Sequence, residues 1–277
     1  MVKDRPTDAS DMAPPPEGMS ASVIFRVMRV LELLATQSGG VSVREAARRT
    51  GIDRSAISRL LVQLEKLGFA RKDPSSALYR PSAAFFGMAA AVRSQDSLWE
   101  AARPLLKVVV DRHDETSYLT VLHGFSVVFQ EKIECRQPVR YVVGLGEPFK
   151  LTTGVAGLAI LSVLPEEALD QVLAEPIPKY TARTVTDPLL LREELKAFRS
   201  QGYAVSMGRW TRDGGGVAAP YFNSYGECAG AVAVSGPAAR LTPDRIPGLA
   251  QSVVDAARQL TRRLGWLGEI PPDPPAH

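Results

Sequence analysis

The 277-residue chain has few cysteines, few histidines and few aromatic residues. Cys135 and Cys228 are its only cysteines and neither belongs to a Cys-x-x-Cys motif, which excludes a disulfide scaffold and a structural zinc site. The longest near-apolar run, residues 154–164, is far shorter than the roughly 20 residues of a membrane helix. The first residues carry three aspartates and no apolar core, unlike a signal peptide. We therefore expect a cytoplasmic protein with no membrane partner.

Motifs for catalysis are missing as well. The sequence contains no HExxH, GxSxG or P-loop motif, and Gly214–Gly216 lacks the Gly-Lys-Ser/Thr continuation, so we interpret it as a flexible lead into a strand. His113 falls in the charged segment 111–115, where a solvated helix end is expected, and His123 in a hairpin turn. Both cysteines occupy strand-like positions typical of buried, inert thiols. The sequence thus predicts neither an enzyme nor a bound cofactor or metal.

Charge is unevenly distributed along the chain. The net charge is only +3, but residues 40–80 contain nine basic and four acidic residues, a net +5, which leaves −2 for the remainder. The composition, 45% hydrophobic and 23% charged, is that of an ordinary globular protein, and the length suffices for two domains. A basic module joined to a mildly acidic remainder indicates a polyanion partner for the module alone, although a solvated charged face would give the same excess.

The basic module shows a pattern of three helices. Apolar residues at three- and four-residue spacing form the stripe of a first helix: Val23, Val27, Val30, Leu31 and Leu34. Ser42 and Glu45 form a capping box that begins a second helix, residues 43–50. Gly51 provides a turn, and Asp53 is placed to cap a third helix.

The third helix has two distinct faces. Its apolar face is predicted to be buried and comprises Ile57, Leu60, Leu61, Leu64 and Leu67. Small hydroxyl and cationic residues occupy the opposite face: Ser55, Ser58, Arg59, Val62 and Lys66. Residues 69–71 and 77–80 form a short β-hairpin around the turn at 73–76. Together these elements predict a winged helix-turn-helix domain.

A major groove accepts one such helix, whose first turns reach base edges. Arg59 matches guanine O6 and N7, and the hydroxyls of Ser55 and Ser58 are adaptable donors or acceptors. Cations that suit phosphates, which position without specifying sequence, lie around this face: Arg54, Lys66, Arg71, Lys72 and Arg80. We add Ser42, which opens the second helix, to this predicted interface with double-stranded operator DNA. A protein-binding winged helix is the alternative.

The remainder alternates strands and helices. Helices are predicted at 82–93, 97–112, 153–164, from 165, at 188–201 and at 243–264; strands are predicted at 118–123, 126–134, 139–143, 203–207, 216–222 and 228–235, with a short strand before the helix at 153. Strands first and last with helices between indicate an α+β sheet domain. The helix at 97–112 packs either on its own domain or as a linker that also contributes to a dimer contact.

The chain resembles the IclR family of transcriptional regulators over residues 20–264. The resemblance depends on residues 29–34, 43–47 and 51–68 in the first domain, and on 144–146, 152–161, 202–204, 218–220 and 232–237 in the second. It implies a ligand-responsive DNA-binding regulator, acting as a homodimer or dimer of dimers, with a GAF-like effector domain. We accordingly expect a disordered tail at 1–19, the winged helix-turn-helix domain at 20–81, linker helices at 82–112, the effector-binding domain at 113–264 and a proline-rich tail at 265–277.

The start of the helix at 153 is the candidate effector site. Free N–H groups and the helix dipole favour a carboxylate there, beside Thr152, Thr153, Gly154 and Val155, although capping by either threonine would also satisfy those groups. The resemblance adds further lining residues, which are Leu145, Gly146, Met207, Gly216, Ala218, Ala233 and Ser235.

Two departures from the family pattern, at residues 156–157 and 206–213, mean that the effector preference of relatives does not transfer. Arg209, Trp210 and Arg212 are placed either to meet an anionic or aromatic effector or, as we prefer, in a solvated loop. The sequence leaves open a regulator that needs no ligand and, as a third reading, an enzyme with a DNA-binding head. It favours a repressor without separating repression from activation.

Overall fold

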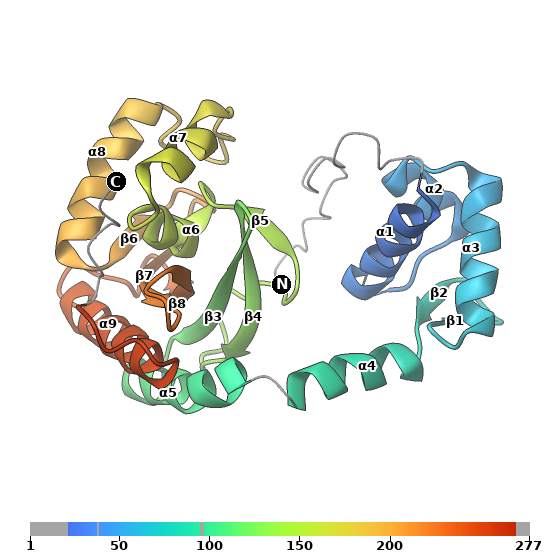
Figure 1. Cartoon of the computed structure of the whole chain (residues 1–277), viewed down its shortest axis with the longest axis horizontal. Coiled ribbons are helices and arrows are strands. Elements are labelled where there is room, and N and C mark those ends of the chain that lie inside the picture. Colours follow the sequence, from blue (N-terminus) through green and yellow to red (C-terminus); the bar gives the residue numbers. More distant parts are fainter. Residues whose placement is uncertain (1–21, 38, 95–96, 270–277) are drawn as a thin grey trace. The chain divides into compact units, whose positions relative to one another are not determined.

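The computed structural model describes residues 22–269 except 38, 95 and 96. The tail expected at 1–19 and most of the one at 265–277 lie outside these residues. The chain divides into two compact units, Met1–Asp96 and Ser97–His277, which are treated separately below (Figure 1). Within the described ranges, no helix combines the length and apolar character needed to span a bilayer.

The first unit is a winged helix-turn-helix domain followed by one further helix. It contains α1 (Val23–Thr36), α2 (Val43–Thr50), α3 (Arg54–Lys66), β1 (Ala70–Lys72), β2 (Tyr79–Pro81) and α4 (Ala83–Ser94). The antiparallel hairpin β1–β2 forms the wing, and Val41 adds an isolated bridge to Tyr79. Two predicted core positions were wrong, because Val23 at the start of α1 is 65% exposed and Leu67 at the end of α3 is 69% exposed.

Local capping fixes where α2 and α3 begin. The backbone N–H of Glu45 donates to Ser42 Oγ at 3.1 Å, whereas the Glu45 carboxylate pairs with Arg48, so only half of the predicted capping box forms. Gly51 ends α2 with φ at 69°, a left-handed conformation that a side chain would strain. Asp53 caps α3 by accepting from the backbone N–H groups of Ser55 and Ala56, as predicted.

The second unit is an α+β domain around a six-stranded antiparallel sheet of order β5-β4-β3-β8-β7-β6. Its strands are β3 (Thr116–His123), β4 (Ser126–Ile133), β5 (Pro148–Lys150), β6 (Ala204–Met207), β7 (Gly214–Phe222) and β8 (Cys228–Pro237). Its helices are α5 (Ser97–His113), α6 (Gly154–Leu161), α7 (Glu166–Ala174), α8 (Pro188–Gln201) and α9 (Ile246–Arg263). Helices α5 and α9 cover one face of the sheet, and α6 packs on the other (Figure 1).

The predicted strand at 139–143 does not form. Its backbone groups bind side chains instead of a neighbouring strand. Arg240 donates to the Val139 carbonyl, and the Tyr118 hydroxyl donates to the Tyr141 carbonyl and accepts from Val143 N–H. Three further boundaries differ from the prediction. Helix α6 stops at Leu161, α9 begins at Ile246 rather than at 243, and the glycines at 214–216 belong to β7 itself.

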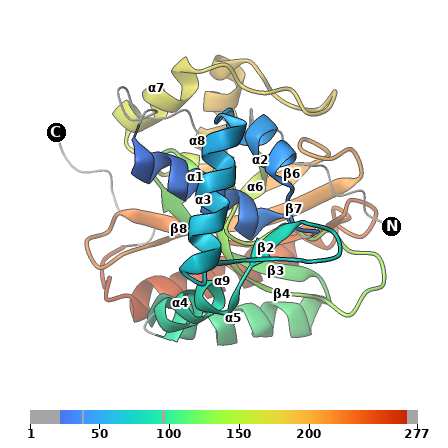
Figure 2. The ribbon, with the colours of Figure 1, turned by 90° about the vertical axis from the view of Figure 1, so that its right-hand side faces the viewer.

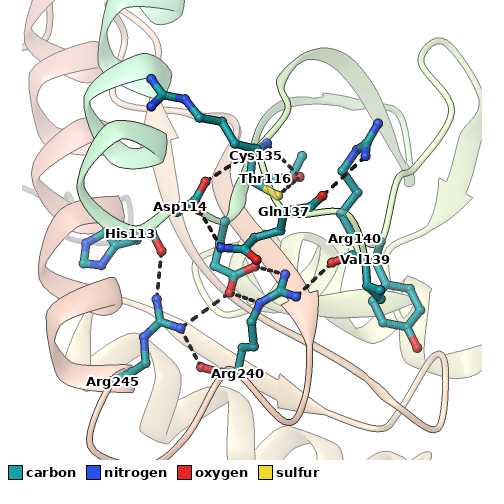
Figure 3. Close-up of polar contacts among 12 residues, drawn as sticks. His113, Asp114, Thr116, Cys135, Gln137, Val139, Arg140, Arg240 and Arg245 are labelled. Atoms are coloured by element: carbon teal, nitrogen blue, oxygen red, sulfur yellow. Dashed lines mark hydrogen bonds and ion pairs between the residues drawn. The ribbon is translucent and has the colours of Figure 1, made fainter.

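A buried ion cluster joins the end of α5 to the loop before α9. Glu115 is 1% exposed; Arg240 donates to its two carboxylate oxygens at 2.7 and 2.6 Å, and Arg245 lies 3.5 Å away. Arg240 also donates to the Val139 carbonyl and Arg245 to the His113 carbonyl, at 2.8 Å in each case. Figure 3 shows both contacts. The segment at 111–115 is therefore partly an internal anchor, not the solvated helix end that was expected.

Candidate nucleic-acid interface and effector site

The outer face of α3 presents its polar residues to solvent. Ser55, Ser58 and Arg59 are all exposed on this face, and so are Arg54 and Lys66. Among the described residues, neither Arg54 nor Arg59 nor Lys66 has an acidic partner within ion-pair distance. Figure 2 shows α3 with the β1–β2 wing extending from its side of the same unit. The predicted DNA-reading face is thus accessible and cationic.

The wing carries two further exposed cations. Arg71 and Lys72 lie on β1, where the Lys72 ammonium is 5.7 Å from the centre of the Tyr79 ring. Hydrogen bonds from the Ser75 side chain and from the Ser75 and Ser76 backbones to Asp73 hold the turn, and they lower the pKa of Asp73 to about 2. Arg71 and Lys72 are therefore held on a short, well-capped hairpin.

Two predicted contacts are less accessible. Arg80 is half-buried beside Gly40, and its Nε is buried without a hydrogen-bond partner in the described structure. Ser42 is also half-buried, and its hydroxyl oxygen already accepts the α2 capping bond. Both residues are therefore less accessible than the cations of α3 and β1, which are exposed.

The start of α6 is the second candidate site, and neither threonine caps it. Thr153 occupies the N-cap position without a side-chain capping bond, and its hydroxyl lies 3.2 Å from that of Tyr180. The Thr152 hydroxyl oxygen is buried without a partner among the described residues. The capping alternative left open by the sequence therefore does not apply. The first-turn N–H groups of α6 keep their ability to bind an anion.

A ladder of aromatic rings leads to this helix start. Tyr118, Phe129, Phe149 and Trp210 contact one another edge to face, with ring centres 5.3, 5.6 and 5.3 Å apart. A Cβ built on Gly154 would lie 3.6 Å from Trp210, so this ring packs directly beside the first residue of α6. Trp210 is partly buried against the core, which corrects the preferred interpretation of this segment as a solvated loop.

The same correction holds for Arg209. Its guanidinium donates two hydrogen bonds of 2.7 Å to the Glu194 carboxylate on α8. The Thr181 and Thr184 hydroxyls donate to the Gly208 and Arg209 carbonyls at 2.6 and 2.7 Å. The loop that carries Trp210 is thus held on two sides. Of the three residues in question, only Arg212 remains exposed.

Sheet register decides which predicted lining residues face α6. Ser235 pairs with Gly216 and Ala233 with Ala218, and these four residues share the α6 face. Ala218 and Ala233 are almost fully buried, beneath α6 rather than in open space. Leu145 and Gly146 lie exposed in the adjoining loop, where Gly146 N–H donates to the Phe129 carbonyl.

Met207 does not belong to this set. It packs on the opposite face of the sheet, against the cluster formed with α5 and α9. Its neighbour Ser206, which pairs with Gly216, lies on the α6 face instead. Because side chains alternate between the two faces of a strand, the prediction was off by one position.

The remaining polar candidates have structural partners. His113 Nε2 lies 2.8 Å from Ser252 Oγ, and burial followed by the nearby Arg112 and Arg245 lowers the pKa of its imidazole. Cys135 is buried, and burial raises the pKa of the Cys228 thiol to about 12, in line with the inert thiols that were predicted. The described residues contain no group of three potential metal ligands.

The chain joins a winged helix-turn-helix, with an exposed cationic third helix, to an α+β domain. This combination defines a DNA-binding transcriptional regulator. Models of the IclR helix-turn-helix domain and of the bacterial transcriptional regulator IclR C-terminal domain match residues 23–74 and 89–262. The chain belongs to the IclR family.

Two curated relatives and one solved structure illustrate this. The regulator BhcR of Paracoccus denitrificans is 31% identical over 85% of each chain. The transcriptional repressor IclR of Escherichia coli is 26% identical over 88% of this chain and 90% of its own. An IclR homologue of Microbacterium hydrocarbonoxydans, solved with 4-hydroxybenzoate, has a TM-score of 0.74 at 23% identity and covers 87% of this chain and 98% of its own.

Proposed function

We propose that the chain is a repressor whose affinity for operator DNA is controlled by a small aromatic carboxylate bound at the start of α6. The observation that carries the proposal is an α6 N-terminus free of side-chain caps, with the Trp210 ring packed beside it. It serves as a regulator acting on cytoplasmic DNA rather than as an enzyme.

On the DNA side, Ser55, Ser58 and Arg59 reach base edges when α3 enters the major groove. The phosphate-binding residues, which set position but not sequence, are Arg54, Lys66, Arg71, Lys72 and, at the edge of the interface, Arg80 and Ser42. The exposure of the α3 and β1 cations and their lack of acidic partners in the described module support these roles.

On the effector side, the carboxylate accepts from the first-turn N–H groups of α6 and from the Thr152 hydroxyl, whose oxygen has no partner among the described residues. The aromatic part lies against Trp210 and Phe149, close to the row of Gly216 and Ser235. The 4-hydroxybenzoate in the Microbacterium hydrocarbonoxydans homologue is a compound of this class. Leu145, Gly146 and the segment 153–155 complete the proposed wall, with Ala218 and Ala233 forming its floor.

The apolar surface of α4 supports pairing of two copies, since Phe86 and Met88 on this helix are 65% and 57% exposed. A helix with such an apolar surface needs a partner. We propose that it contributes to a homodimer, which assembles as a dimer of dimers on operators that offer four half-sites. An effector then changes operator affinity only through its different affinities for the two arrangements of DNA-binding heads.

Operator binding tests the DNA half of this proposal. DNA flanking the gene is titrated with the full-length protein at several salt concentrations. Arg59→Ala should weaken specific binding by about 1–3 kcal/mol and relax preference at one base pair. Lys72→Ala should weaken all DNA alike and reduce the slope of log K against log salt by about one. Unchanged operator affinity for Arg59→Ala would refute the assignment of α3 as the reading helix.

The effector half is tested by adding benzoate, 4-hydroxybenzoate and aliphatic carboxylates to the same complex. Release of operator by an aromatic acid, lost in Trp210→Ala, supports the proposal. Tight binding that no compound alters favours a regulator that needs no ligand, and turnover of any acid would favour an enzyme. Thermal shift provides the independent readout, because a ligand at 100 times its Kd adds about 2.7 kcal/mol of stability.

A further inference from the structure

The hydroxyl group of Ser55 is already committed as a donor. Oδ1 of Asp53 accepts from Ser55 N–H at 2.8 Å, from Ser55 Oγ at 2.5 Å and from Ala56 N–H at 3.3 Å. These bonds, the one from the Ser55 side chain first, lower the pKa of Asp53, so its carboxyl group is ionised at neutral pH. A carboxylate only accepts hydrogen bonds, and a serine has one hydroxyl proton. That proton therefore points at Asp53.

Ser55 offers only its oxygen lone pairs to anything that approaches from outside. It is exposed on the second position of α3, on the face that enters the groove in the proposed function, on which this inference depends. If Ser55 donated to a base instead, it would lose its hydrogen bond to the ionised Asp53 carboxylate. Such a hydrogen bond is roughly twice as strong as one between neutral groups. The hydroxyl thus retains its bond to Asp53 and acts outward as an acceptor.

In the major groove, the hydrogen-bond donors are the exocyclic amino groups, N6 of adenine and N4 of cytosine, whereas N7, guanine O6 and thymine O4 are acceptors. We propose that Ser55 reads an exocyclic amino group, so that the base it contacts is adenine or cytosine, and that Asp53 is the positioning residue that fixes this polarity. Ser58 lies one turn further along and has no hydrogen bond from its hydroxyl to any described residue. It therefore retains both roles.

The test is a cycle between protein variants and base analogues. Operators are selected from random duplex DNA with the full-length wild-type protein and with Ser55→Ala, and the position at which Ser55→Ala loses preference identifies the contacted base. At that position adenine is replaced by purine, or cytosine by 2-pyrimidinone, which removes only the amino group. A 7-deazapurine at the contacted base pair removes the competing N7 acceptor. Ser58→Ala is the matched control.

We expect removal of the amino group to weaken operator binding by the wild-type protein about 3- to 10-fold, the size of one neutral hydrogen bond. The affinity of Ser55→Ala for the same DNA should not change. The 7-deaza analogue should change the operator affinity of the wild type and of Ser55→Ala by the same factor. Loss of the Ser55-dependent affinity on 7-deaza substitution, or an unchanged preference in Ser55→Ala, would overturn the inference. If the wild type selects no sequence at all, the proposed function fails first and takes this inference with it.

Asp53→Ser tests the positioning role without removing the cap, because serine caps helices about as well as aspartate. A neutral hydroxyl at position 53 both donates and accepts, so Ser55 regains the freedom to donate outward. Discrimination against the amino-deleted base should then fall toward that of Ser55→Ala while the complex still forms. Full discrimination in Asp53→Ser would show that Asp53 does not set the polarity.

Discussion

Replacing Arg240 by methionine should destabilise the second unit strongly, because it leaves the Glu115 carboxylate buried and almost alone. Arg240 donates to both Glu115 oxygens and, through Nη1, to the Val139 carbonyl. Methionine retains much of the aliphatic stem but none of these donors. Of the cations in the described residues, only Arg245, at 3.5 Å, then remains beside Glu115, which is 1% exposed.

The expected size follows from this geometry. Removing one partner of a buried ion pair costs about 3–5 kcal/mol when the other charge stays behind. Here the lower end applies, since Arg245 remains and the Arg240 side chain is itself 25% exposed. For a domain of this size, about 3 kcal/mol lowers the melting temperature by about 6–12 °C. The double variant Glu115→Gln/Arg240→Met should be at least about 1 kcal/mol more stable than the sum of the single losses predicts, because it leaves no buried charge behind.

Tryptophan fluorescence of the full-length protein measures this directly, because Trp99, Trp210 and Trp266 all belong to the second unit. Lys107→Met is the control. It breaks an exposed pair with Asp111 on α5, which is worth about 0.3–0.5 kcal/mol. If Arg240→Met melted no earlier than Lys107→Met, or if the double variant showed simple additivity, the ion cluster would not be the anchor described here.

Two further predictions use the same fluorescence assay. Gly157→Ala should lower the free energy of unfolding by about 3 kcal/mol, because its Cβ would lie 2.0 Å from the Leu151 carbonyl oxygen. Gly248→Ala is the control; its Cβ meets nothing closer than 3.7 Å, so this variant should be neutral or stabilising. Equal stability of the two variants would contradict this reasoning. Burial lowers the pKa of His113 below 6.5, so the unfolded chain binds the proton more readily than the folded one. The free energy of unfolding should therefore fall as the pH drops below about 6.5, and this fall should be smaller in His113→Gln. An identical pH profile in the variant would contradict the assignment.

The first unit was predictable almost residue by residue because its determinants are local. Ser42, Gly51 and Asp53 act on residues two to four positions away, and helical periodicity places Ile57 and Leu61 in the core. The errors fell at helix ends, at Val23 and Leu67, where the periodic stripe continues but the neighbouring helices no longer cover it. Periodicity predicts a face and not the extent of its cover.

The second unit was harder to predict because its details depend on contacts across long sequence separations. Nothing near Glu115 in the sequence indicates that Arg240 and Arg245 neutralise it. Likewise, nothing near 139–143 indicates that Tyr118 and Arg240 form hydrogen bonds with the backbone of this segment. Met207 was placed among the lining residues by the family resemblance, which does not establish the register of a four-residue edge strand. The pairing of Ser206 with Gly216 determines it.

The two buried carboxylates constrain how an effector can act on α5. Glu131, 4% exposed on β4, accepts from the Trp99 indole near the start of α5, and Glu115 lies just beyond its end. Both ends of α5 are thus tied to the sheet or to its connecting loops. Because α6 lies on the opposite face of the sheet, a ligand there can reach α5 through the sheet itself or through the 134–147 loop, whose Val139 carbonyl is bound by Arg240 and whose Tyr141 carbonyl is bound by Tyr118. Tyr118 is also the last ring of the ladder that begins at Trp210, so the 134–147 loop contacts both the aromatic ladder and the ion cluster.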